Sequence, residues 1–231
     1  MKYNKSITEK KKNAFKNIIK PKLIVLGNSN VGKSSFIKFL IKNKKLTTGI
    51  VGKTPGTTKS IEKYTIPTLP FEIIDLPGFG EFSTLSKVEK EKSKIKIIEY
   101  VENNRKNIFL SILILNAIRI NDELQKWYYE NKNTIPLSCE FVSWLKELKI
   151  DTIILINKID KLKKSEVILI EEKYITVLKE LGIIDKNFIN NNEIKNDPII
   201  RSVSLKYNLN LNGLKNIIFQ KFEFYKNKNS K

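Results

Sequence analysis

Among 231 residues the sequence has no histidine, one cysteine and one methionine. Without histidine, a Ser-His triad, a His-ligated zinc site and an imidazole general base are excluded. Cys139 alone can form neither an internal disulfide nor a cysteine-cluster metal site, which fits a reducing cytoplasm. We therefore expect Cys139 to be a small hydrophobic residue of the core.

A hydrophobic run long enough to cross a membrane is also missing. The longest strongly apolar stretch, 108–118, has 11 residues, whereas a membrane-spanning helix needs roughly 20. The basic N-terminus lacks the apolar block of a secretory signal. These absences predict a soluble, cytoplasmic protein. The length predicts one domain over residues 21–224, with a basic extension over 1–20 and a basic tail over 225–231.

Acidic residues are scarce beside basic ones. There are 43 Lys and Arg against 24 Asp and Glu, a net charge of +19, and only three of the cations are Arg. Basic ends of this kind would neutralise phosphates on RNA, and such binding would weaken as salt rises. The same surplus of Lys, with abundant Asn and Ile, is also what AT-rich coding produces without any function. Charge alone leaves both interpretations open.

Short apolar runs alternate with longer amphipathic stretches, a pattern typical of an α/β fold with a mostly parallel sheet. Two of the runs are separated only by Pro67 and Thr68, which predicts one hairpin. Strands are expected near 23–26, 61–66, 71–74, 109–115, 152–156 and 199–203, and helices near 34–42, 87–103, 121–130 with 140–147, 165–181 and 211–224.

Glycine is scarce too, but seven of the nine glycines lie within residues 27–80. There an apolar strand runs into GNSNVGKS, which matches GxxxxGKS in the strand–loop–helix context that this motif requires. Backbone N–H groups of such a loop face an anion, Lys33 supplies charge for the β- and γ-phosphates, and the Ser34 hydroxyl can bind Mg²⁺. The predicted nucleotide-binding residues here are Gly27, Asn28, Ser29, Asn30, Val31, Gly32, Lys33, Ser34 and Ser35.

A second motif, Asp75-Leu76-Pro77-Gly78, ends the apolar run FEIID. An acid at the end of a strand can hold Mg²⁺ through a water molecule, and the Gly78 N–H can reach a γ-phosphate. DxxG alone is usually a turn. Its place 41 residues after Ser34, at the end of a strand, makes it a strong prediction.

The third motif, Asn157-Lys158-Ile159-Asp160, follows the run TIILI. The Asp160 carboxylate offers two acceptors that match the N1–H and the exocyclic amino group of guanine, which adenine does not present. Asn157 would connect this loop to the phosphate loop, and the Lys158 stem would lie along the base. The three motifs in this order favour GTP over ATP.

These motifs, with a threonine-bearing loop between the first two, resemble those of the TRAFAC class of GTPases. The segments SNVGKSS, KTPGTT and DLPGFG are similar to those of the EngB (YihA/YsxC) branch of the TrmE–Era–EngA–EngB group. Residues 135–148, which precede INKID, resemble the archaeal members of that branch. The resemblance covers about residues 20–220. It implies a Ras-like P-loop GTPase fold, with a mostly parallel six-stranded sheet that has helices on both faces.

The resemblance also implies a function. It makes the chain a monomeric, Mg²⁺-dependent GTPase whose bound GTP or GDP controls its contact with the ribosomal large subunit or its precursor during assembly. Older descriptions of the family speak instead of cell division and septation, with a protein partner, and this remains an alternative. By position, Thr58 becomes a Mg²⁺ ligand ordered by GTP, with Thr57 as its rival and Gly56 beside them.

The last guanine-binding motif is expected at Ser204-Leu205-Lys206, where Leu205 stands in place of the family's usual Ala. Its backbone N–H would reach guanine O6. For hydrolysis, the resemblance assigns Lys33, Thr58 and Gly78 to catalysis. Phe79 occupies the position where many relatives carry a water-orienting Gln, which predicts slow intrinsic turnover.

Two further predictions concern side chains whose roles stay open. Asn30 resembles the asparagine that helps related GTPases to coordinate K⁺, although it would equally brace the loop. Four aromatic side chains lie between two predicted strands, where rings beside lysines could stack on RNA bases. Their helical spacing favours packing in the core instead. They are Trp127, Tyr128, Tyr129 and Trp144.

Overall fold

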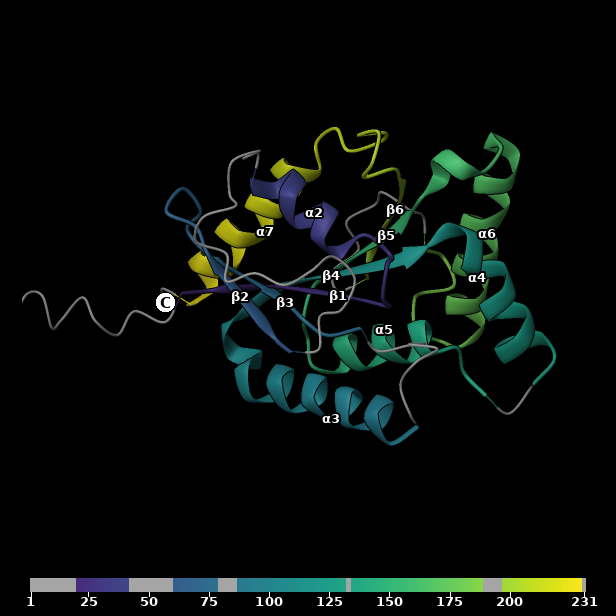
Figure 1. The fold of residues 1–231 in the computed structure, drawn as a ribbon, viewed down its shortest axis with the longest axis horizontal. Helices are drawn as coiled ribbons and strands as arrows, with labels where there is room; N and C mark the ends of the chain where they lie inside the picture. The colour runs from purple at the N-terminus through teal and green to yellow at the C-terminus, as the bar shows by residue number, and fades with distance from the viewer. Residues whose placement is uncertain (1–19, 42–59, 79–86, 132–133, 189–196, 230–231) are drawn as a thin grey trace, which may run out of the picture.

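The structure is a computed structural model that describes residues 20–41, 60–78, 87–131, 134–188 and 197–229. Its six-stranded sheet has the order β2-β3-β1-β4-β5-β6 (Figure 1). Neighbouring strands are parallel except β2, which runs antiparallel to β3. The predicted fold class and hairpin are therefore confirmed. The strands are β1 Lys22–Gly27, β2 Glu62–Thr65, β3 Glu72–Asp75, β4 Ile108–Asn116, β5 Thr152–Asn157 and β6 Ile199–Val203.

The helices follow the predicted pattern, with ends that shift by up to five residues. Asn116 caps the helix after β4 by accepting a hydrogen bond from Ile118 N at 3.2 Å, so that helix begins at Ala117 rather than near 121. The last helix begins at Leu214, because Asn210 and Gly213 have φ of 57° and 74°. The helices are α2 Lys33–Ile41, α3 Lys87–Asn104, α4 Ala117–Leu124, α5 Leu137–Glu147, α6 Lys164–Glu180 and α7 Leu214–Asn229, with short turns η2 Arg105–Asn107, η3 Gln125–Tyr129 and η4 Ile159–Lys161.

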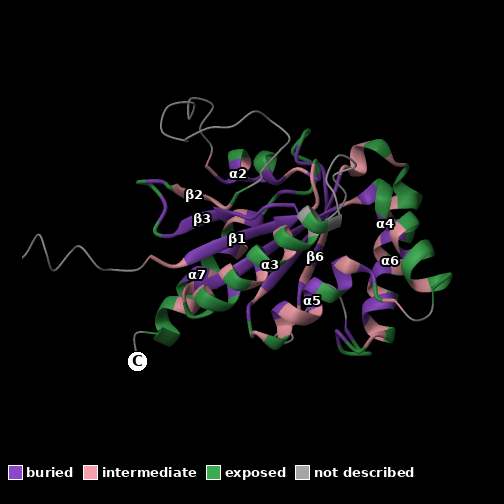
Figure 2. Cartoon of the chain, turned by 60° about the horizontal axis from the view of Figure 1, so that its bottom comes forward, coloured by how far each residue is buried: buried purple, intermediate pink, exposed green. Residues whose placement is uncertain are grey.

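Helices cover both faces of the sheet, and each face has its own core. Leu23 and Val25 of β1 pack in the cluster that contains residues of α2 and α7, whereas Ile24 and Leu26 pack in the cluster of α3 to α6. β1 is therefore buried along its whole length (Figure 2). This double burial explains why the strands of the parallel sheet read as continuous apolar runs. None of the described helices is both long and apolar enough to span a bilayer.

The four aromatic side chains divide between core and surface, so the core prediction was wrong for two of them. Tyr128 and Trp144 pack against the α3–α6 cluster. Trp127 and Tyr129 are 40% and 45% exposed, because the π-helical turn η3 breaks the helical spacing on which the prediction rested.

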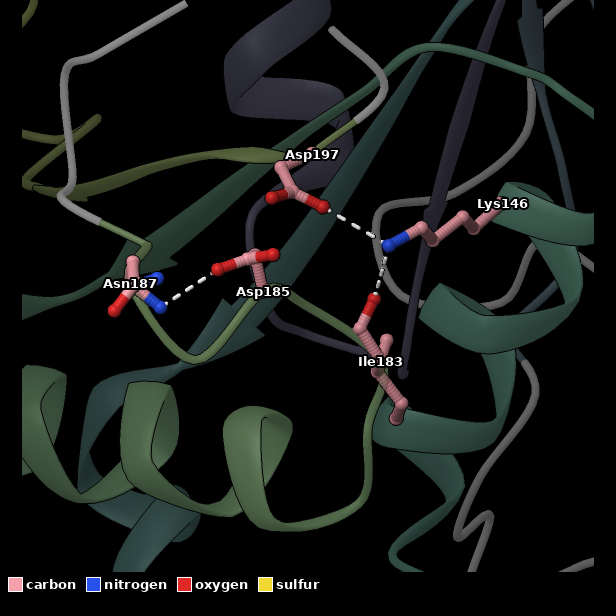
Figure 3. Close-up of polar contacts among 5 residues, drawn as sticks. All are labelled: Lys146, Ile183, Asp185, Asn187 and Asp197. Atoms are coloured by element: carbon pink, nitrogen blue, oxygen red, sulfur yellow. Dashed lines mark hydrogen bonds and ion pairs between the residues drawn. The ribbon is translucent and has the colours of Figure 1, made fainter. Parts of the chain in front are cut away.

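The connection into β6 is anchored at the edge of the sheet where β5 begins. Lys146 of α5 donates a hydrogen bond to Ile183 O at 2.6 Å and pairs with Asp197 at 3.0 Å (Figure 3). Nearby, Asp185 accepts a hydrogen bond from Asn187 N at 2.7 Å. The Asp197 side chain is only 5% exposed, so this ion pair is largely shielded from water on its acidic side.

Candidate nucleotide-binding site

The predicted motifs meet at one edge of the sheet, because each directly follows a strand or forms its end. β1 ends at Gly27, β3 at Asp75 and β5 at Asn157. These three strands are parallel to one another or to their shared neighbour β4, so their carboxyl ends lie on the same side. In an open α/β sheet this is the edge where ligands bind.

The loop after β1 has a backbone that only glycine allows at two points. Gly27 has φ of +146° and Gly32 has φ of +116°. A Cβ at Gly27 would lie 2.4 Å from Ile114 O, and one at Gly32 would lie 2.4 Å from Asn157 Nδ2. Between them, Asn30 is left-handed with φ of 61°. The loop is thus wound tightly against β4 and the loop after β5.

Lys33 is enclosed by this loop. Its Nζ donates hydrogen bonds to Gly27 O and Asn28 O, both at 3.2 Å, and the residue is 7% exposed. Burial lowers the pKa of Lys33, and the charge of Asp75 partly opposes that effect. The ammonium group is therefore held in place by main-chain oxygens before any phosphate arrives.

Asp75, at the end of β3, is 1% exposed, and its buried Oδ1 has no hydrogen-bond partner among the described residues. Burial raises the pKa of Asp75 to about 6; Lys33 acts in the opposite direction, and Glu62 raises the pKa further. A buried carboxylate oxygen that lacks a partner suits a cation, and the exposed Ser34 offers a hydroxyl at the start of α2. Oxygen donors of this kind are the ligands that Mg²⁺ prefers, so these residues fit a magnesium site.

Gly78 lies directly against the phosphate loop. A Cβ there would be 2.8 Å from Ser29 Oγ and 2.9 Å from Ser29 N, so no larger residue fits. Leu76, which lies between Asp75 and Gly78 in the sequence, is fully buried and donates its N–H to Val25 O at 3.1 Å. Pro77 completes the turn that brings Gly78 to the loop.

Asn157 joins three loops. Its Nδ2 donates to Val31 O at 2.6 Å, and its Oδ1 accepts from Leu205 N at 3.0 Å. The side chain therefore connects the loop after β5 to the phosphate loop on one side and to the loop after β6 on the other. Because Asn157 is 4% exposed, both hydrogen bonds are shielded from water.

Asp160 is held by a side chain for which the sequence predicted no such role. Ser204 Oγ donates to Asp160 Oδ1 at 2.5 Å and accepts from Tyr207 N at 3.3 Å. Lys158 has a left-handed φ of 74°; burial and then the charges of Lys161 and Arg119 lower its pKa, against the opposing effect of Asp160. In the sequence, the signal for this contact was Ser204 itself, which directly follows β6 and lies two positions before Lys206.

The loop after β6 is closed by two main-chain hydrogen bonds between Ser204 and Leu209, at 3.2 and 3.0 Å. Leu205 is 6% exposed and would lie 3.3 Å from a Cβ at Gly32, so its larger side chain fills space beneath the phosphate loop. Lys206 extends over the ring of Tyr207, with Nζ 4.7 Å from the ring centre. Gly56, Thr57, Thr58 and Phe79 lie outside the described residues.

Comparisons with known proteins agree with this architecture. A sequence model described as a 50S ribosome-binding GTPase matches residues 22–158. A probable GTP-binding protein EngB of Methanococcus maripaludis is 43% identical over 147 residues, which are 64% of this chain and 60% of that relative. One of Pyrococcus horikoshii is 35% identical over 200 residues, 86% of this chain and 82% of that relative.

A crystal structure of a probable GTP-binding protein EngB superposes with a TM-score of 0.68 at 32% identity, and the match covers 87% of this chain and 98% of that one. The chain therefore spans about three fifths of the length of the Methanococcus relative. It spans nearly the whole of the solved EngB structure. The chain belongs to the EngB family of GTP-binding proteins.

Proposed function

We propose that the chain hydrolyses GTP to GDP and acts, as a cytoplasmic monomer, as a nucleotide-gated switch in assembly of the large ribosomal subunit. The observation that carries the nucleotide assignment is the Asn157 bridge. It joins the loop that reads the base to the loop that holds the phosphates, and so sets the distance between the two ends of one ligand.

Selection of guanine rests on Asp160. The Ser204 hydroxyl fixes the orientation of this carboxylate, so its acceptors meet the two guanine donors without reorganisation. Adenine lacks that donor pair and would leave the remaining acceptor positions of the carboxylate without donors in a partly buried place, which is costly. The Lys158 stem and the main chain at Leu205 and Lys206 complete the base pocket.

Hydrolysis is assigned to the phosphate end. Lys33 would stabilise charge on the β- and γ-phosphates, the Gly78 N–H would bind the γ-phosphate, and Ser34, Thr58 and Asp75 would hold Mg²⁺. When bound, Mg²⁺ neutralises charge on the phosphate oxygens as it develops. Phe79 cannot hydrogen-bond an attacking water, so intrinsic turnover is slow. Asn30, an exposed residue of the phosphate loop, would provide one ligand for a stimulating K⁺ ion.

The ribosomal role is supported by the family description and by charge. The matching sequence model is described as a 50S ribosome-binding GTPase, and a net charge of +19 suits a partner rich in phosphate. Switching requires that GTP and GDP favour different states of the contact surface. The segments expected to differ are those around Thr58 and directly after Gly78.

Co-sedimentation with the organism's own large ribosomal subunits tests this proposal. A non-hydrolysable GTP analogue and GDP are compared at moderate and at raised salt. Retention with the analogue and release with GDP is the expected result. Equal binding in both states that disappears as salt rises would reduce the interaction to nonspecific lysine contacts, and would favour a protein partner of the kind that a septation GTPase switches.

A further inference from the structure

Glu62 and Asp75 face each other across the hairpin at the metal end of the site. They are direct partners in the antiparallel register of β2 and β3. Directly opposite residues of an antiparallel pair point to the same face of the sheet, with Cβ atoms about 5 Å apart. Glu62 therefore presents a second carboxylate beside Asp75, on the face that carries α2.

A hydrogen bond holds the Glu62 side chain. Tyr64 Oη donates to Glu62 Oε2 at 2.8 Å, and Tyr64 itself packs against the cluster of α2 and α7. Tyr64 lies two residues after Glu62 on the same strand, so it shares that face. The Glu62 carboxylate is thus held on the face of the sheet that carries α2.

This pairing is unfavourable without a ligand, since like charges directly opposite each other destabilise a strand pair. The described neighbours offer little compensation. Lys33, whose charge acts on Asp75, already donates to two main-chain oxygens. Lys63 projects to the other face, where it pairs with Glu72 at 2.7 Å. In the part of the chain that the structure describes, two acids thus face one cation, and Asp75 Oδ1 is buried without a partner there.

We propose that Glu62 is a positioning residue of the magnesium site, one that makes retention of the nucleotide depend on Mg²⁺. Without the metal, the charge of Glu62 repels the phosphates of the nucleotide. With the metal bound, the Glu62 carboxylate would attract the cation. The inference rests on the proposed nucleotide binding and adds to it a residue that none of the motifs contains.

The test compares Glu62→Gln with wild type in the release of N-methylanthraniloyl-GDP, with Mg²⁺ present and with Mg²⁺ removed by EDTA. Gln keeps an oxygen that can accept from Tyr64 but removes the charge. The ratio of the release rate in EDTA to that in Mg²⁺ should fall about threefold to tenfold, mainly through slower release in EDTA. The Mg²⁺ concentration that gives half-maximal retention should rise by a similar factor.

Two further variants separate this role from simpler ones. Glu99→Gln makes the same charge change at an exposed position of α3, on the other face of the sheet, and should leave the ratio unchanged. Tyr64→Phe keeps both carboxylates but removes the hydroxyl that holds Glu62, and should lower the ratio by a smaller factor. It also provides the measurement if Glu62→Gln does not fold.

Each outcome is decisive. An unchanged ratio in Glu62→Gln, or an equal fall in Glu99→Gln, would overturn the role of Glu62 while nucleotide binding by wild type stands. If wild type retained no guanine nucleotide in Mg²⁺, both this inference and the proposed function would be overturned.

Discussion

The two halves of the site treat their buried polar groups differently. At the base end, Asn157 makes two hydrogen bonds to other loops, and Ser204 makes one to Asp160 and one within its own loop. At the phosphate end, Asn28 Oδ1 and Asp75 Oδ1 are buried without partners among the described residues, and Glu62 adds a like charge opposite Asp75. Among the described residues the polar groups of the base end are paired, whereas we expect metal and nucleotide to complete the phosphate end.

This difference separates two sources of binding free energy. A preformed pocket loses little entropy when it receives a base, so its hydrogen bonds contribute mainly to discrimination. Buried groups without partners destabilise the unliganded phosphate end. Binding of metal and phosphates supplies those partners, so it stabilises this end by more free energy. The ligand should therefore stabilise the phosphate end more than the base end.

The largest effect is expected from Asp160→Asn, which changes the chemistry of the base end without altering its shape. The amide would lose one acceptor for the guanine amino group and gain a donor that suits the carbonyl of xanthine. GTP affinity should fall by about 100-fold or more, and xanthosine triphosphate should become the preferred nucleotide. Competition against a fluorescent guanine nucleotide measures both. Unchanged GTP affinity would contradict the assignment of the base-reading loop.

Asn157→Ala would break the link between the two halves. Val31 O and Leu205 N would both lose their partner in a buried position, so the free energy of unfolding should fall by about 2–3 kcal/mol. Urea unfolding of the nucleotide-free protein measures this loss. Asn121→Ala is the matched control, because Asn121 accepts a hydrogen bond from Lys173 at 3.0 Å on the exposed surface. An equally small change in both variants would show that the bridge contributes little.

Asp75→Asn should raise the free energy of unfolding, whereas Asn157→Ala lowers it, because Asp75 belongs to the end of the site whose buried groups lack partners among the described residues. The pKa of Asp75 is about 6 in the folded protein and 3.8 is its ordinary value. The folded state therefore holds the proton more tightly, and the resulting stability is full below pH 4 and is lost as pH rises through 6. In EDTA at pH 7.5, the variant should be more stable than wild type by on the order of 1–2 kcal/mol.

Urea unfolding at pH 4 and pH 7.5 tests the sign as well as the size. The advantage of Asp75→Asn should be present at pH 7.5 and largely absent at pH 4, where the wild-type carboxyl is protonated. Retention of nucleotide by the variant should meanwhile lose its response to Mg²⁺. A stability difference that does not vary with pH would show that the carboxylate is not the source of the cost.

The fold was predictable from the sequence because its strands are buried on both faces. Continuous apolar runs marked β1, β4 and β5 to within about a residue, and the strand–loop–helix motif located the loop between β1 and α2. Less could be predicted where a single side chain overrides periodicity. The Asn116 cap makes α4 begin at Ala117, four residues before the predicted start. The π-helical turn η3 places Trp127 and Tyr129 at the surface.

The polar contacts within the site were harder to predict than its position. The hydrogen bond from Ser204 to Asp160 joins residues 44 positions apart, so it depends on how β5 and β6 align. Glu62 was missed for a related reason. Its place opposite Asp75 follows from the register of the hairpin, and a shift of one residue would turn its side chain to the other face.

The smallest predicted effect is that of Ser204→Ala, and it tests whether the base end owes its function to being preformed. The variant keeps Asp160 but removes the hydroxyl that orients it, along with the acceptor for Tyr207 N. One hydrogen bond of this kind contributes about 1 kcal/mol, so GTP affinity should fall about threefold to tenfold. The preference for guanine over xanthine should persist, because the carboxylate itself remains. A shift in preference would mean that Ser204 takes part in reading the base. An unchanged affinity would mean that the bound nucleotide, rather than Ser204, orients Asp160, so that the base end would be completed by its ligand as we expect of the phosphate end.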